Sequence, residues 1–134
     1  MTQQPMFPAK FNSPITTLAI AIDDTVTTIS VVDATKLPPA PNLATIGVGE
    51  SAETIKYEGI SGNDLTNVTR GFQGTASSWG VGITVSRMFT AYDYDALREN
   101  HEDHIISDAP HIFGNVYKLQ YNSETGALEI WKMT

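Results

Sequence analysis

"VTRGFQGTASSWGVGITVSRMF", from Val68 to Phe89, is the stretch on which the interpretation of the fold depends. Its glycines belong either to a phosphate-binding loop or to turns between two strands. A phosphate loop follows a strand and opens a helix, so that backbone N–H groups and the helix dipole face the anion. Here no Gly-Lys-Ser/Thr occurs, and the glycines lead into "ITVSRMF", which alternates as a strand does. The stretch therefore predicts a structured loop between two strands, held in place by Phe72 and Trp79.

Strand patterns continue on both sides of this loop. Residues 18–22 alternate and residues 26–32 are rich in β-branched side chains, so we expect these two segments to pair as a hairpin. In "ETIKYEGI", Ile55 and Tyr57 should share one face of a strand. Residues 117–131 alternate on either side of a turn, which predicts a C-terminal β-hairpin.

One segment has the pattern of a helix, at about residues 91–106. Thr90 and Asp93 have the spacing of a capping box at its start. Residues three and four apart then share one helix face, and these are Tyr94, Leu97, His101 and His104. We predict that this face is an interface stripe.

Together these patterns predict a mainly β (α+β) fold with one short α-helix and a C-terminal β-hairpin. Residues 1–14 contain three prolines, which favour extended backbone, and we expect an arm that is loose or laid against a neighbour. Residues 15–134 should form a single β-rich domain, because a chain of this length fits one domain.

Composition excludes several classes of function. The formal net charge is −7, from eight Lys and Arg against fifteen Asp and Glu, and the basic residues do not cluster, so we expect no nucleic-acid partner. The absence of cysteine excludes disulfides, thiol nucleophiles and Cys-based metal sites. No stretch reaches the roughly 18 apolar residues of a membrane span, and the start lacks the pattern of a secretory signal. We therefore expect a soluble protein, made in a cytoplasm, with no membrane partner.

No arrangement of residues predicts catalysis, a cofactor or a metal. Adjacent acidic residues lie in turns or at the helix start, and no serine stands in a Gly-x-Ser-x-Gly elbow. The nearest approach to a metal site is "HEDHIISDAPH", with His101, His104 and His111. Its first two histidines are three residues apart, whereas the zincin motif needs four. We expect no enzyme, no cofactor and no bound metal, with the three histidines as the alternative metal ligands.

The aromatic residues leave a second function open. Trp79, Trp131 and Tyr92 are candidate platforms for stacking on saccharides, as in a carbohydrate-binding module for cell-wall polymers. Each of them can equally seal a small core or an interface.

The segment Glu53 to Leu97 resembles one that recurs in tail, baseplate and fibre-associated proteins of siphophages that infect Gram-positive bacteria. An "I-x-Y" strand and a "V-x-R-G-x-x-G-T" strand end are followed by a tryptophan, a glycine-rich turn and a "V-x-R" strand that enters a short helix. The chain is similar to small tail-region proteins of Bacillus siphophages and to the N-terminal shoulder domain of lactococcal phage receptor-binding proteins. That resemblance implies a small antiparallel β-sandwich.

The resemblance also implies a function. The shoulder domain attaches a trimeric receptor-binding protein to the baseplate, so we expect a structural protein that acts by docking. Its partners would be copies of itself, as a trimer or a multiple of three, and other tail or baseplate proteins. It would reside in the host cytoplasm during assembly and then in the virion tail. The chain has no counterpart of the saccharide-binding head, so the resemblance supplies no receptor-binding residues.

Overall fold

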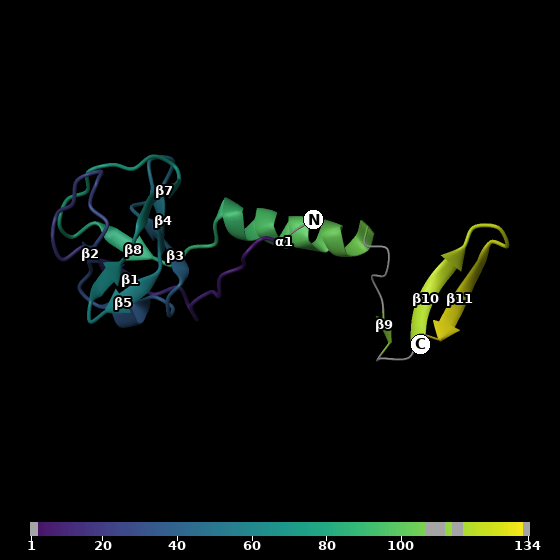
Figure 1. The fold of residues 1–134 in the computed structure, drawn as a ribbon. Helices are drawn as coiled ribbons and strands as arrows, with labels where there is room; N and C mark the ends of the chain where they lie inside the picture. Colours follow the sequence, from purple (N-terminus) through teal and green to yellow (C-terminus); the bar gives the residue numbers. More distant parts are fainter. Residues whose placement is uncertain (1–2, 107–111, 114–116, 133–134) are drawn as a thin grey trace. The chain divides into compact units, whose positions relative to one another are not determined.

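The computed structural model describes residues 3–106, 112–113 and 117–132 (Figure 1). The chain divides into two compact units, Pro5–Asp95 and Met1–Gln4 with Ala96–Thr134. The sequence suggested a single domain over residues 15–134, whereas this division falls within the helix. Most of the expected arm, from Pro5 onward, belongs to the first unit.

The unit Pro5–Asp95 contains two antiparallel sheets. The larger sheet has the order β1-β8-β3-β4-β7, with bounds Ile15–Thr17, Thr84–Ser86, Asn42–Ile46, Glu53–Tyr57 and Thr69–Gln73. The smaller sheet has the order β2-β6-β5, with bounds Ile29–Ser30, Asp64–Thr66 and Gly59–Ser61. A 3-10 helix, η1 (Ala34–Lys36), lies between β2 and β3 in the chain.

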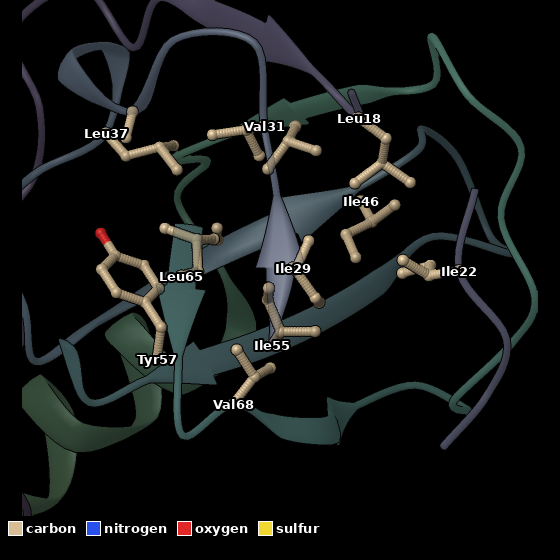
Figure 2. Packing of buried hydrophobic residues seen from close by; sticks show 13 residues of the cluster. Leu18, Ile22, Ile29, Val31, Leu37, Ile46, Ile55, Tyr57, Leu65 and Val68 are labelled. Atoms are coloured by element: carbon tan, nitrogen blue, oxygen red, sulfur yellow. The ribbon is translucent and has the colours of Figure 1, made fainter. Parts of the chain in front are cut away.

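Side chains from both sheets meet in one hydrophobic core (Figure 2). Ile46, Ile55 and Val85 come from the larger sheet, and Ile29 and Leu65 come from the smaller one. All five are fully buried. The expected β-sandwich is therefore confirmed, as is the burial of Ile55 on the core face of its strand.

The glycine-rich stretch lies where the sequence placed it, between the strands β7 and β8. Gly71, however, lies inside β7, where the pairing with β4 shifts register between Thr54 and Lys56. Such a shift inserts extra residues on one strand and bends it. The bend turns the backbone of Gly71 toward the start of β4.

The hairpin expected from residues 18–22 and 26–32 is reduced to a single antiparallel bridge between Leu18 and Val31, flanked by backbone hydrogen bonds from Ala19 to Ser30 and from Val32 to Thr17. β1 ends at Thr17 and pairs with β8, while β2 pairs with β6. Ile22 bridges to Trp79, and Ile20, which strand alternation would place on the same face as Leu18 and Ile22, is 62% exposed. Long-range pairing partners thus override the local alternation of the sequence.

The helix and the C-terminal hairpin are confirmed. α1 spans Ala91–Ile106, and a separate three-stranded sheet has the order β11-β10-β9, with bounds Ala127–Lys132, Tyr117–Asn122 and Ile112–Phe113. The expected capping box is also present: the backbone N–H of Thr90 donates to Asp93 at 2.8 Å, and that of Asp93 donates to the Thr90 hydroxyl at 3.3 Å. These two bonds satisfy donors that the helix itself leaves unpaired.

Candidate functional site

A fully buried carboxylate, Glu53, stands at the start of β4 on the same strand face as core residues. Its Oε1 accepts from the indole N–H of Trp79 (2.9 Å), from Arg70 Nη2 (2.9 Å) and from the backbone of Ser77 (3.1 Å). Its Oε2 accepts from Arg70 Nε at 2.7 Å and from the backbone of Gly71 at 3.0 Å. The glycine-rich loop therefore does hold an anion, but the anion is a side chain of the same protein.

Arg70 also connects this cluster to other loops. Besides its bidentate pair with Glu53, it donates to the backbone carbonyls of Asp23 (2.6 Å), Val26 (3.2 Å) and Ser77 (2.7 Å). The planar guanidinium suits such a role, because its donors point outward in a fixed fork. One side chain thus fixes the turn after Ile22 and the loop before β8.

The chemistry of Glu53 follows from these contacts. Burial raises the pKa of its carboxyl, but hydrogen bonds from Arg70, from Trp79 and from two backbone N–H groups outweigh burial and lower the pKa to about 2. In the described part of the chain, every buried side-chain nitrogen and oxygen has a hydrogen-bond partner. A group held ionised and fully bonded is unsuited to proton transfer near neutral pH. Glu53 is a structural anion.

Gly74 shows how tightly the loop closes on β4. It adopts φ +78, and a Cβ built on it would lie 2.8 Å from the backbone oxygen of Ala52. We expect Gly74→Ala to lower the free energy of unfolding by about 2–4 kcal/mol, since left-handed strain and overpacking add. Gly62→Ala is the matched control, because Gly62 has φ +62 but open space around it, and about 1 kcal/mol should be lost there. Denaturant unfolding of both variants measures the difference, and equal losses would contradict a tight approach at Gly74.

Arg87 forms a second internal cluster, where the N-terminal segment meets the larger sheet. Its Nη1 and Nη2 donate to both carboxylate oxygens of Asp93, at 2.8 and 2.7 Å. Its remaining donors reach the carbonyls of Phe7 (3.0 Å), Pro8 (3.2 Å) and Met88 (2.6 Å). The N-terminal segment, expected as an arm that is loose or laid against a neighbour, is therefore fastened to the sheet at Phe7 and Pro8.

The Arg87 cluster also fixes the start of α1. Burial raises the pKa of the Asp93 carboxyl, but Arg87 and the Thr90 hydrogen bonds outweigh burial and hold the pKa below its usual value. The side chain of Asn42, which is fully buried in β3, accepts from Arg87 Nε at 2.8 Å and donates to Pro8 at 3.0 Å. Sheet, helix start and N-terminal segment thus share one network.

The predicted interface stripe lies on the surface of α1. Tyr94 is 56% exposed and Leu97 is 52% exposed. His101 and His104 are exposed as well. The stripe is thus available for contact with another molecule, and whether it forms an interface stays a prediction.

The alternative metal ligands are not brought together in the part of the chain that the structure describes. His111 lies outside the described residues. Among residues 3–106, 112–113 and 117–132, no group of three His, Cys, Asp or Glu side chains is placed to hold a metal ion.

Two of the three candidate stacking residues have partners within the Pro5–Asp95 unit. Trp79 donates to Glu53, and a Cβ on Gly47 would lie 2.9 Å from its ring, so the ring packs against bare backbone. Tyr92 contacts the rings of Phe7 (centroids 5.8 Å apart) and Phe72 (5.1 Å), and its hydroxyl donates to the Pro5 carbonyl at 2.7 Å. Trp131 lies in β11, and its side chain falls outside the described part of the structure. Trp79 and Tyr92 therefore belong to separate clusters.

Phe72 and Trp79, which we predicted to hold the loop in place, thus have different roles. Trp79 holds the loop through Glu53, while Phe72 packs against the first turn of α1. Sequence reasoning missed Glu53 itself. Its signal was available, because in "ETIKY" it stands on the same alternating face as Ile55 and Tyr57.

A groove of about 380 Å³ lies between the β3–β4 turn and the start of α1. Two apolar side chains on its lining, Val48 and Phe89, are each 76% exposed. The polar residues of the lining are Thr45, Glu50, Thr54, Gln73 and Thr90. A concave surface with exposed apolar side chains suits contact with another macromolecule.

Two further findings concern the chain as a whole. Within the described residues, no helix has the length and apolar character needed to cross a bilayer. Searches of protein-family models, of curated proteins and of solved structures find no match to this chain.

Proposed function

We propose that this protein is a structural component of a phage tail or baseplate, which acts by docking to other tail proteins and to copies of itself. The observation that carries the proposal is that the buried charged side chains bond to other parts of the same chain. Arg70, Arg87 and Glu53 are the buried charges of the larger unit, and each is engaged in fixing loops, strands and the N-terminal segment. Charged residues that are engaged in this way stabilise the fold, and contacts with other molecules are then made by surface residues.

Exposed apolar side chains support the docking part of the proposal. Val48 and Phe89 at the groove, and Tyr94 and Leu97 on α1, are all more than half exposed. Soluble monomers seldom gather such side chains into contiguous patches, which are typical of protein–protein contact sites. The stripe on α1 is the proposed contact between copies, and the groove is the proposed contact with other tail proteins.

Immunogold labelling tests the proposal. Antibodies against the purified protein are applied to purified particles, and to tail assembly intermediates, of the phage that encodes the chain. We expect gold at the tail or baseplate, and we expect labelling to disappear when the antibody is first absorbed with the protein. Unlabelled particles and intermediates, with the protein present only in the soluble lysate, would overturn the proposal.

A further inference from the structure

Residues 5–8 are held by side chains that bind their backbone. The donors, which we call the arm cradle, are Asn42, Arg87 and Tyr92. Arg87 donates to the carbonyls of Phe7 (3.0 Å) and Pro8 (3.2 Å). Asn42 also donates to Pro8, at 3.0 Å. The Tyr92 hydroxyl donates to the Pro5 carbonyl at 2.7 Å. The cradle therefore recognises a segment of polypeptide by its carbonyl groups.

One side chain of the segment adds to this recognition. The ring of Phe7 lies 5.8 Å from the ring of Tyr92, centroid to centroid, and Lys56 Nζ lies 5.6 Å from the centroid of the Phe7 ring. A cation at this distance from an aromatic face is attracted to it. Each of these contacts, like the carbonyl bonds, depends on the sequence of the segment. None of them depends on whether segment and cradle belong to the same chain.

The turn that brings the segment back to its own sheet has an unfavourable backbone. It lies in residues 9–14, where Asn12 has φ 61 and Ser13 has φ 43, and the backbone N–H of Ser13 donates to Lys10 at 2.9 Å. Positive φ is disfavoured for residues other than glycine. Ser13 also precedes Pro14, and the residue before a proline favours extended backbone. Local sequence therefore favours an open form of this turn.

Opening the turn exposes little that is now buried. Phe11, within the turn, is already 87% exposed, and Ile15, where β1 begins, is 61% exposed. β1 stands at the end of the strand order of the larger sheet. Extended, residues 9–14 reach about 20 Å. An opened segment thus leaves from the edge of the sheet and can reach a neighbouring molecule.

We infer that copies of this chain exchange their N-terminal segments, so that residues 5–8 of one copy lie in the arm cradle of another. The exchange keeps every bond between segment and cradle and removes the left-handed turn. Swapping an identical element is a low-cost route to an oligomer, and a strained hinge promotes it. The inference rests on the proposed docking between copies, because docked copies offer one another the cradle at high effective concentration.

Isotope-filtered NMR on the full chain tests the exchange. Labelled and unlabelled chains are unfolded and refolded together, and NOEs between labelled and unlabelled protons then report contacts between chains. We expect such NOEs between the rings of Phe7 and Tyr92. The ring of Phe72, 5.1 Å from that of Tyr92, is the internal control, because neither residue belongs to the exchanged segment. Its NOEs to Tyr92 should arise within one chain. If the Phe7 NOEs also arise only within one chain, the segments are not exchanged and the inference is wrong.

Two opposite substitutions at Ser13 test the role of the turn. Ser13→Gly relieves the left-handed strain of the closed form, so it should raise the dissociation constant of the oligomer roughly fivefold or more. Ser13→Pro fixes φ at about −65° and removes the N–H that donates to Lys10, so it should exclude the closed form and lower the dissociation constant. Light scattering over a dilution series measures both. Equal dissociation constants for the two variants would contradict the inference, and the NOEs between Phe72 and Tyr92 report whether each variant has folded.

Light scattering also separates this inference from the proposed function. Wild type should have a mass that is a multiple of 14.6 kDa. Such a mass, with every NOE from Phe7 to Tyr92 arising within one chain, would leave the docking between copies in place and remove the exchange. A wild type that stays monomeric would remove both, while gold labelling would still decide the tail location. Exchanged segments in a protein that labels no particle would remove the tail location alone.

Discussion

Glu53→Gln should lower the free energy of unfolding at pH 7 by about 3 kcal/mol. The amide has nearly the shape of the carboxylate, but it leaves Arg70 without its anion and turns an NH₂ group toward donors. A pKa lowered from 4.5 to about 2 corresponds to that amount of stabilisation of the ionised form. Denaturant unfolding measures the loss. The control is Glu58→Gln, which breaks an exposed pair with Lys56 and should cost less than about 1 kcal/mol.

The same variant should change how stability depends on pH. Because the pKa of Glu53 is lower in the folded state, the unfolded chain binds the extra proton, and the contribution of Glu53 is present above about pH 4.5 and lost as the pH falls to about 2. Glu53→Gln has no carboxylate at this position to become protonated between about pH 4.5 and 2. Its deficit relative to wild type should therefore shrink from about 3 kcal/mol at pH 7 to a small fraction of that near pH 2. A deficit that stays constant with pH would show that the carboxylate charge has no such role.

Arg87→Met is expected to cost about 3–5 kcal/mol, because it leaves Asp93 as a largely buried carboxylate without its cation. The loss should also be visible locally. Phe7 and Pro8 each lose the guanidinium that their carbonyls accept from, so amide exchange should accelerate over the first residues of the Pro5–Asp95 unit. Hydrogen-exchange mass spectrometry and denaturant unfolding provide the two measurements.

Arg98→Met is the matched control for Arg87→Met. Arg98 pairs with Glu102 on the surface of α1, at 3.1 Å, and exposed pairs of this spacing contribute about 0.3–0.5 kcal/mol. The control should leave exchange near Phe7 unchanged. If Arg87→Met leaves that exchange unchanged as well, the N-terminal segment is held by its aromatic contacts with Tyr92 and not by the guanidinium.

Much of the architecture could be predicted from local sequence. The helix at 91–106 has a capping box at Thr90 and Asp93. Both the capping box and the helical spacing depend on residues only three or four positions apart. The C-terminal hairpin was equally accessible, because alternation on either side of a turn sets the register. The same reasoning failed at Ile20, since the pairing of β1 with β8 joins residues about seventy positions apart.

The polar clusters were not accessible in this way. Glu53, Arg70 and Trp79 are separated by up to 26 positions, and Arg87 meets Pro8 across 79 positions. A local sequence pattern shows whether a segment is a strand or a helix. It does not show which distant residue will pair with a charged side chain. The sequence therefore favoured a structured loop over a binding loop at these glycines, but it did not identify Glu53 as the group that lies against them.

The sequence by itself determined a small β-rich protein with one capped helix and a terminal hairpin, because capping, alternation and turn chemistry act between neighbours in the chain. Only the tertiary structure decided what Glu53, Arg70 and Arg87 do. A buried charge is stable only where folding brings enough donors or acceptors around it, and those come from segments that the chain holds far apart until it folds.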